Sequence, residues 1–349
     1  MRAVVIEKQG APVAPNIRCY QDFNDPPEGA DPPPAHALLR TEASALNRMD
    51  LWVGMGLPGV DRPFPRVTGC DVCAIVEKVA HGSDPAWVGK RVIMNAKYEK
   101  PRPDSPDDPP TSTYIPDYEL IGEHIHGAHR ERFIAPISNL AHVGDADPVE
   151  AAAFGLVTLT AYSMVVTKGQ LRPGQSVLIT GIGGGVSTSA LAIAKWLACP
   201  VCVTSRHQWK LDRAKQLGAD WTILDQGQDW SKEARNLTGK RGFDMAIDSV
   251  GKATHLTCIK SLTRGGAYVS CGSTTGPDAT TDLARLFWNQ LRILGSTMGS
   301  NAEFREIAAL FRAGRLKPVI DKVFPWSEAP AAWERLEKGE QFGKIVLKW

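Results

Sequence analysis

The sequence predicts an α/β protein with a β-rich first part and a doubly wound parallel sheet after it. Residues 1 to about 150 contain short strand-like runs separated by Pro- and Gly-rich turns. From about residue 158, strands and helices alternate, which is typical of a parallel sheet covered on both faces. The last fifty residues hold one clear helix and a closing strand, so we expect the chain to return to the first part.

The first part is predicted to cover residues 1–157, with strands at 3–6, 37–41, 72–79 and 91–94. Within it, residues 97–119 hold six prolines and many charged residues. Because proline disrupts helices and central strands, we interpret this segment as an exposed lobe.

The second part is predicted to cover residues 158–297, and the return to the first part residues 298–349. Strands are expected at 176–181, 201–205, 221–224, 243–250, 266–272 and 292–296, with helices between them. A helix at 302–314 and a strand at 344–349 complete the predicted elements.

Composition and charge exclude several classes of protein. The 349 residues suffice for two domains with full cores, and a formal net charge of +2 argues against nucleic acid as the main partner. We find neither a secretory signal nor an apolar run near the roughly 18 residues of a membrane span. The two C-x-x-C pairs, at positions 70/73 and 199/202, lie far apart in the sequence and do not predict a four-thiolate zinc site. We therefore expect a cytoplasmic protein that acts on a small molecule and binds neither nucleic acid nor membrane.

A glycine-rich turn at residues 181–187 follows one predicted strand and opens a helix. Glycines allow the backbone to approach a pyrophosphate, whose charge the N–H groups at the helix start can hold. Ser187 occupies the last small-residue position of this glycine-rich motif, where glycine is more usual. The turn predicts dinucleotide binding, with contacts from Gly181, Gly183, Gly184, Gly185 and Val186.

The end of the second strand of this part indicates which dinucleotide is bound. An NAD site usually has an acidic residue there, whereas this chain has Thr204, Ser205, Arg206 and His207, with Lys210 a turn later. Ser205 leaves space for a 2′-phosphate that Arg206 and Lys210 can neutralise, which predicts NADPH as the cofactor. The alternative is that these cations are ordinary solvated charges at a helix start.

The ordered motifs resemble the medium-chain dehydrogenase/reductase superfamily, in particular its quinone oxidoreductase-like, zinc-free branch. The resemblance covers nearly the whole chain and is carried by residues 45–51, 68–71, 89–92, 159–162, 171–174, the glycine-rich turn and 342–347. It implies a GroES-like catalytic domain interrupted by a Rossmann domain. It also implies a homodimer joined through the strand at 292–296.

The resemblance also identifies the positions where many relatives hold a catalytic zinc, here Asn47, Cys70, Asp71 and Leu156. Asn47 is a poor zinc ligand and Leu156 cannot bind a metal, so we expect no metal there. A second candidate is His124, His126 and His129, which we interpret instead as part of an exposed polar strand.

Chemistry without a metal favours reduction of a conjugated carbonyl (an enone or enal) or a quinone, because these spread the developing negative charge themselves. Asn47 is the predicted polar contact to substrate or nicotinamide, or else a turn-forming asparagine. Asp50 is expected to support the site, and Cys70 and Asp71 to line it. Two alternatives remain: a metal-dependent alcohol dehydrogenase and a non-catalytic NADPH-binding sensor.

Further cofactor contacts are expected where predicted strands end, since ligands of this fold gather at the carboxyl ends of strands. The family resemblance adds Thr160, from the motif at 159–162, and Lys344, from the segment that returns to the first part. These predicted contacts are Thr160, Gly272, Ser273, Thr274, Ser296, Thr297, Met298 and Lys344.

Overall fold

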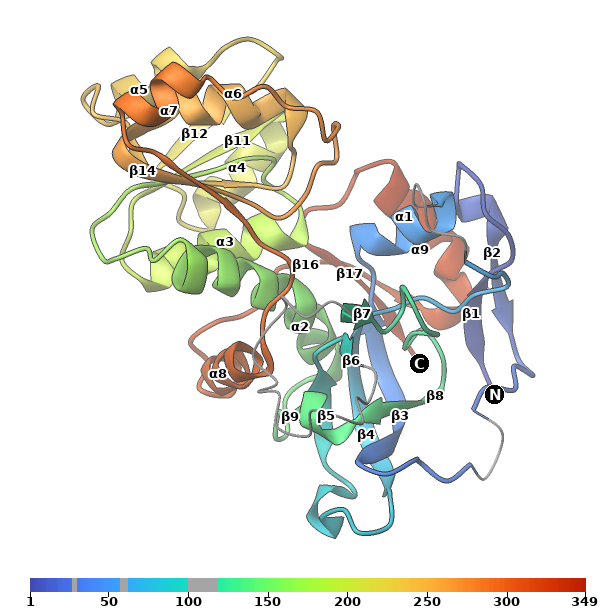
Figure 1. Cartoon of the computed structure of the whole chain (residues 1–349). Helices are drawn as coiled ribbons and strands as arrows, with labels where there is room; N and C mark the ends of the chain where they lie inside the picture. The colour runs from blue at the N-terminus through green and yellow to red at the C-terminus, as the bar shows by residue number, and fades with distance from the viewer. Residues whose placement is uncertain (27–29, 57–61, 100–117) are drawn as a thin grey trace. The chain divides into compact units, whose positions relative to one another are not determined.

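The computed structural model describes residues 1–26, 30–56, 62–99 and 118–349 (Figure 1). The chain forms two compact units, one of Met1–Leu156 with Ser300–Trp349 and the other of Val157–Gly299. The predicted fold class, a β-rich part plus a doubly wound parallel sheet, is confirmed. Most of the predicted Pro-rich lobe, residues 100–117, lies outside the described residues.

The first unit is built on a mixed sheet. Among the described residues its order is β16 (Ile320–Pro325), β17 (Lys344–Lys348), β3 (His36–Ala45), β4 (Asp71–Val79), β5 (Arg91–Met94) and β9 (Leu140–His142), with β8 (Arg132–Pro136) also paired to β3. Two smaller pairs accompany it, β1 (Ala3–Ile6) with β2 (Ile17–Tyr20) and β6 (Lys97–Glu99) with β7 (Tyr118–Leu120). Short 3-10 turns lie at η1 (Ala14–Asn16), η2 (Pro85–Trp87), η3 (Ile137–Asn139) and η5 (Trp326–Glu328).

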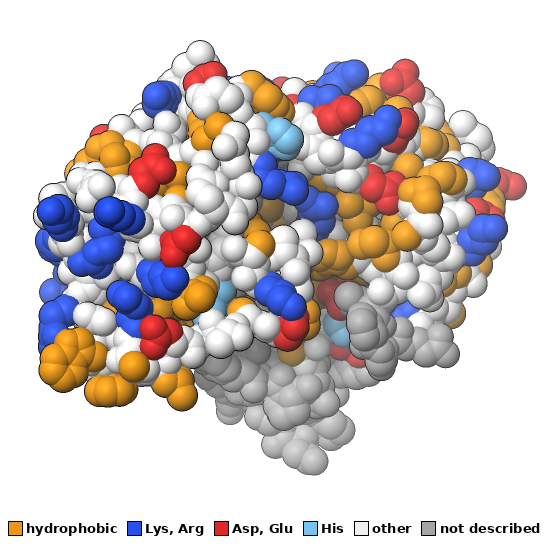
Figure 2. Space-filling model, turned by 90° about the horizontal axis from the view of Figure 1, so that it is seen from above, with side chains coloured by type: hydrophobic (Ala, Val, Ile, Leu, Met, Phe, Trp, Pro, Cys, Tyr) orange, Lys and Arg blue, Asp and Glu red, His pale blue; other side chains and the backbone are white. Residues whose placement is uncertain are grey.

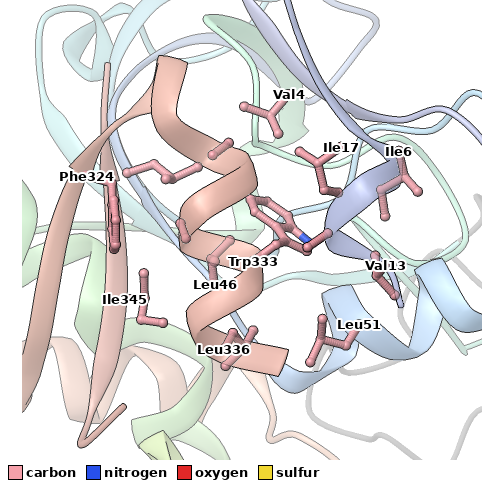
Figure 3. Close-up of a cluster of buried hydrophobic side chains, with 14 of the residues drawn as sticks. Val4, Ile6, Val13, Ile17, Leu46, Leu51, Phe324, Trp333, Leu336 and Ile345 are labelled. Carbon is pink, nitrogen blue, oxygen red and sulfur yellow. The ribbon is translucent and has the colours of Figure 1, made fainter. Parts of the chain in front are cut away.

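The core of this unit joins the two ends of the chain. Its helices are α1 (Arg48–Met55), α8 (Asn301–Arg312) and α9 (Ala329–Glu337). Trp333 of α9 is fully buried and lies between side chains of β1, α1 and β17 (Figure 3). Accordingly, the blue N-terminal strands and the red helix α9 lie side by side in Figure 1. The sequence analysis expected a single helix in the last fifty residues and missed α9, whose nine residues give only a short amphipathic pattern.

Strand β17 connects this core to the candidate site. Successive side chains of a strand point to opposite faces of the sheet. Ile345 and Leu347 belong to the cluster around Trp333, so Lys344 and Val346 face the other side. The packing of Ile345 and Leu347 in the core thereby determines the face of the sheet to which the Lys344 side chain points.

The second unit, all of which is described, contains a six-stranded parallel sheet. Its order is β12 (Trp221–Leu224), β11 (Val201–Ser205), β10 (Val177–Ile179), β13 (Phe243–Asp248), β14 (Leu262–Ser270) and β15 (Arg292–Gly295). Its helices are α3 (Gly185–Trp196), α4 (Gln208–Gln216), α5 (Ser231–Leu237), α6 (Lys252–Ser261) and α7 (Leu283–Trp288). Since the order reverses direction beside the first strand, β10, this is the doubly wound arrangement in which ligands bind at the carboxyl edge.

The boundary between the units falls within helix α2 (Pro148–Tyr162), which continues as a π-helical segment η4 (Ser163–Lys168). The sequence analysis found no apolar run near membrane-spanning length, and this was wrong. Residues Pro148–Lys168 form 21 helical residues, and the most apolar 18-residue window within them has a mean hydropathy of 1.6. In the structure 78% of the most apolar window is buried within the protein, which is typical of the core helix of a globular domain.

Candidate functional site

A buried polar centre in the first unit contains the four predicted catalytic residues, Asn47, Asp50, Cys70 and Asp71. Asn47 lies between β3 and α1 and is the N-cap residue of α1. The backbone N–H of Asn47 donates to the carboxylate of Asp50, in the first turn of α1, at 2.7 Å. Asp71 is the first residue of β4, which pairs with β3, and Cys70 immediately precedes it. All four side chains are at most 6% exposed. The sheet therefore brings together two sequence segments that lie more than twenty residues apart.

Lys344 of β17 completes this centre. Its ammonium donates to the Leu46 carbonyl at 2.7 Å, to Asn47 Oδ1 at 2.6 Å and to Asp71 Oδ2 at 2.8 Å. An ammonium has three N–H groups, so protein atoms take all of them. The predicted cofactor contact of Lys344 stays a prediction, and these bonds show what its charge does in the structure.

The side chains of Asn47 and Asp71 also hydrogen-bond to each other and to the backbone. Asn47 Nδ2 donates to Asp71 Oδ2 at 3.0 Å and to the Ala45 carbonyl at 3.4 Å. Asp71 Oδ1 accepts the backbone N–H of Leu156 at 2.5 Å. The amide of Asn47 is thus oriented by an ammonium on its oxygen and a carboxylate on its nitrogen.

These residues do not fit a catalytic zinc. Asn47 Oδ1 and Asp71 Oδ2 already accept from an ammonium, and Leu156 contributes only a backbone N–H. Burial raises the pKa of the Cys70 thiol well above its ordinary value, and the charges of Asp50 and Asp71 raise it further. In the described part of the chain no three His, Cys, Asp or Glu side chains lie close enough to hold a metal.

Asp50 belongs to a second buried pair. Its Oδ1 accepts the Gly69 N–H at 3.0 Å and lies 3.6 Å from His129 Nε2. Burial raises the pKa of Asp50, but hydrogen bonds and charge from His129 and the Asn47 N–H outweigh it and leave the pKa below its ordinary value. A Cβ at Gly69, whose φ is +103°, would lie 2.7 Å from the His129 ring. The glycine therefore permits this close approach of loop and imidazole.

The histidine segment differs from its prediction. The sequence analysis placed His124, His126 and His129 on an exposed polar strand, but residues 122–124 form a turn and His129 is fully buried. His124 Nδ1 accepts from Leu120 N–H, His126 Nδ1 from Val67 N–H, and His129 Nδ1 bonds Ser44 Oγ at 2.9 Å. The three rings serve three different local contacts, because the turn breaks the alternation that a strand would have.

The candidate cofactor site of the second unit is the turn between β10 and α3. Gly181 and Gly183 have φ of +61° and +116°, a region that favours glycine, and α3 begins at Gly185. Ser187 Oγ lies 3.1 Å from the Gly181 carbonyl and 3.0 Å from the Gly184 carbonyl, and its single O–H donates to one of them at a time. Ser187 therefore braces the turn from within. The N–H groups at the start of this twelve-residue helix can hold a pyrophosphate.

The end of β11 lies beside this turn. Ile182 N–H donates to the Thr204 carbonyl at 2.8 Å, which ties the turn to the strand that carries Ser205. Arg206 is exposed, whereas Lys210 is 8% exposed and runs along the turn, since a Cβ on Gly183 would lie 2.8 Å from its Cδ. The structure therefore brings Lys210 to the glycine-rich turn. The contacts of Ser205, Arg206 and Lys210 with a cofactor stay predictions.

Asp248, the last residue of β13, is a buried polar residue of this edge that the sequence did not lead us to predict. An acidic residue at the end of a predicted strand of this sheet could have indicated it. Asp248 is fully buried and accepts from Thr180 Oγ1, from Val250 N–H at 2.9 Å and from Gly251 N–H at 3.2 Å. The hydroxyls of Thr254 and Tyr268 add bonds of 3.0 and 2.6 Å. The carboxylate thus holds the ends of three neighbouring strands in place.

Apart from Thr160, which lies in α2, the other predicted cofactor contacts of this unit lie on loops that follow its strands. Thr274 Oγ1 donates to the Ser249 carbonyl at 3.1 Å, which pins the loop holding Gly272 and Ser273 to the end of β13. Thr160 Oγ1 lies 4.0 Å from the sulfur of Met298, and Ser296 and Thr297 follow β15. These positions are consistent with a binding edge, and their contacts with a cofactor stay predictions.

Two family models match the chain. Residues 33–145 match the model described as alcohol dehydrogenase GroES-like domain, and residues 185–313 match the one described as zinc-binding dehydrogenase.

Individual proteins are similar over nearly the whole length. A zinc-type alcohol dehydrogenase-like protein of Schizosaccharomyces pombe is 30% identical over 90% of this chain and 91% of its own. A 2-haloacrylate reductase of a Burkholderia species is 28% identical over 99% and 98%. A solved structure of an NAD-dependent alcohol dehydrogenase superposes with a TM-score of 0.91, at 36% identity and 100% coverage of both chains.

Proposed function

Because the chain belongs to the medium-chain dehydrogenase/reductase superfamily, we propose that this oxidoreductase uses NADPH to reduce a small conjugated carbonyl or a quinone without a catalytic zinc. When bound, the dinucleotide supplies a hydride. The residues that would hold it are the glycine-rich turn and the strand ends around it. The protein's own part is to orient the acceptor and to stabilise charge as it develops.

The observation that carries the proposal is the bonding of the Lys344 ammonium to Asn47 and Asp71, two of the residues at the positions of the zinc ligands. Oxidising an alcohol requires loss of a hydroxyl proton, which a metal ion usually assists by lowering its pKa. Here Asn47 and Leu156 stand at two of the positions that match the zinc ligands, and the Lys344 ammonium donates to Asn47 Oδ1 and Asp71 Oδ2. A conjugated acceptor delocalises the negative charge into its own carbonyl, so hydrogen-bond donors suffice. The similarity to a 2-haloacrylate reductase supports the same class of substrate.

An alcohol dehydrogenase is the second candidate. The specific observation in its favour is the name given to similar proteins, including the solved structure at 36% identity. Those names also raise NAD as the rival cofactor. The two candidates differ in whether turnover needs a metal, and this difference can be measured directly.

The test is NADPH oxidation by protein dialysed against a chelator, with a panel of quinones, enals, enones and a 2-haloacrylate. We expect turnover of at least one acceptor, unchanged by the chelator. Oxidation of simple alcohols that appears only after zinc is restored would instead establish the second candidate. Tight NADPH binding without turnover of any compound would indicate a non-catalytic sensor.

The cofactor preference has its own test at Arg206. Replacing a cation that contacts a 2′-phosphate should weaken NADPH binding by about tenfold and leave NADH binding unchanged. The variant is Arg206→Ala, with Lys215→Ala as the control because Lys215 is an exposed cation on α4, the helix that follows Arg206. Equal affinity of the wild-type protein for NADH and NADPH would remove the case for NADPH.

We also propose a homodimer that forms through the second unit. In this fully described unit β15 pairs only with β14, so its other edge is open. Leu283, Phe287 and Trp288 of α7 are each at least 68% exposed, and large exposed apolar groups often mark interfaces. Figure 2 shows hydrophobic side chains gathered among charged ones on the visible face. A monomeric mass in analytical ultracentrifugation would reject the dimer.

A cytoplasmic location remains part of the proposal. All seven cysteines are free thiols, as expected in a reducing compartment. Cell fractionation that recovers the protein outside the cytoplasm would reject it.

A further inference from the structure

Three oxygen atoms converge on the ammonium of Lys344. They are the Leu46 carbonyl at 2.7 Å, Asn47 Oδ1 at 2.6 Å and Asp71 Oδ2 at 2.8 Å. The lysine side chain is 4% exposed and that of Asp71 is fully buried, so the ion pair is shielded from water. A neutral amide, a backbone carbonyl and a carboxylate around one positive charge form a cation site whose occupant belongs to the chain itself.

The sequence brings this occupant from far away. Lys344 is separated from Asn47 by 297 residues and from Asp71 by 273. The core residues on either side of the contact, Leu46 and Ile345, are buried in the cluster around Trp333 (Figure 3). The ammonium is therefore held in place by hydrophobic packing, and not only by its own hydrogen bonds.

We propose that Lys344 is a built-in cation that takes the place of the catalytic zinc that many members of the superfamily hold at the positions of Asn47, Cys70, Asp71 and Leu156, and that its ammonium excludes a divalent ion from this centre. A metal bound to Asn47 and Asp71 would need the same two oxygen atoms that the ammonium occupies. It would also place a divalent charge beside an ammonium in a buried site, where like charges repel strongly. The inference deepens the proposed function and rests on its metal-free chemistry.

If Lys344 excludes metal ions, its removal should let the centre bind one, which is not expected of a lysine that only stabilises the fold. Removing the ammonium leaves two oxygen ligands and a buried carboxylate without its counter-ion. Cys70 Sγ lies 3.9 Å from Asn47 Nδ2, so a sulfur atom stands beside these oxygen atoms. We therefore expect one substitution to convert this centre from one that rejects divalent ions to one that binds them.

The experiment measures cobalt bound after equilibrium dialysis of the full-length protein with Co²⁺, using elemental analysis and visible absorption. We expect less than about 0.1 equivalents on the wild-type protein and about one on Lys344→Ala. The double variant Lys344→Ala/Asp71→Asn should fall back to the wild-type level. Lys348→Ala is the matched control, because Lys348 is an exposed lysine of the same strand.

Lys344→Ser is the second variant in case the alanine variant does not fold without metal. For either variant, a melting temperature that rises with Co²⁺ while that of the wild type does not supports the inference. It is overturned if the wild-type protein binds about one equivalent that Asp71→Asn removes, or if neither lysine variant binds more metal than the wild type. These readouts do not involve turnover, so a protein inactive on every acceptor would reject the proposed function and leave this inference standing.

Discussion

Asp71 and Asp248 are both buried carboxylates at the ends of strands, one in each unit, but they are compensated in different ways. Asp71 pairs with the ammonium of Lys344 and accepts two further N–H groups. Asp248 accepts only from neutral donors, namely two backbone N–H groups and the hydroxyls of Thr180, Thr254 and Tyr268. A carboxylate can therefore be buried with one cation or with several dipoles, and the two solutions should respond differently to mutation.

The partners of the two residues also differ in origin. Tyr268 is 20 residues from Asp248 and Thr180 is 68, and all lie within one parallel sheet. Lys344 comes from the opposite end of the chain and from another strand. The bonds of Asp248 are spread over five donors, whereas much of the electrostatic compensation of Asp71 rests on a single side chain.

The largest expected effect is therefore at Lys344. Lys344→Met keeps an unbranched side chain but leaves Asp71 buried without a counter-ion, and breaking a buried pair in this way typically costs about 3–5 kcal/mol of unfolding free energy. Urea unfolding at pH 7 measures it. The exposed Lys348→Met on the same strand should change the free energy by less than about 0.5 kcal/mol. A loss at Lys344 no larger than at Lys348 would mean that the pair contributes little.

A smaller loss is expected at Tyr268. Tyr268→Phe removes one of the five donors to Asp248 and leaves four, so the cost should be about 1–2 kcal/mol. Burial raises the pKa of the Tyr268 hydroxyl, and the adjacent Asp248 carboxylate raises it further, which keeps the hydroxyl protonated as a donor. Urea unfolding followed by near-ultraviolet circular dichroism tests this. A loss of unfolding free energy as large as that of Lys344→Met would contradict the idea that the five donors stabilise the Asp248 carboxylate jointly.

The sequence predicted the alternating strands and helices of the second unit, because that pattern is local and regular. It did not predict α9 or the burial of His129, because nine residues carry little pattern and a turn changed which faces the histidines occupy. Asn47, Cys70 and Asp71 could be grouped through the family resemblance. The actual bonds of Lys344 could not be foreseen, since they depend on strand pairing between the two ends of the chain.

The smallest expected effect is a pH dependence at Asp50, the third buried carboxylate. Its partner is an imidazole at 3.6 Å, with backbone N–H groups from Asn47 and Gly69, so it combines features of the other two. Its pKa is lower in the folded protein than its ordinary value, which is about 3.9 for an aspartate in an unfolded chain. A group with a depressed folded pKa stabilises the protein above the unfolded pKa, and that stabilisation disappears as the pH falls through the folded pKa.

The unfolding free energy of the wild type should therefore exceed that of Asp50→Asn by a constant amount between pH 5 and pH 7, and the difference should shrink below about pH 4. Urea unfolding at pH 7, 5, 4 and 3 measures it, with Asp212→Asn on the exposed face of α4 as the control. A difference that stays constant or grows on acidification would show that the folded protein does not favour the ionised carboxylate. Asp50 would then resemble neither Asp71 nor Asp248, and its role would be to hold the loop at Gly69 as a neutral hydrogen-bonding group.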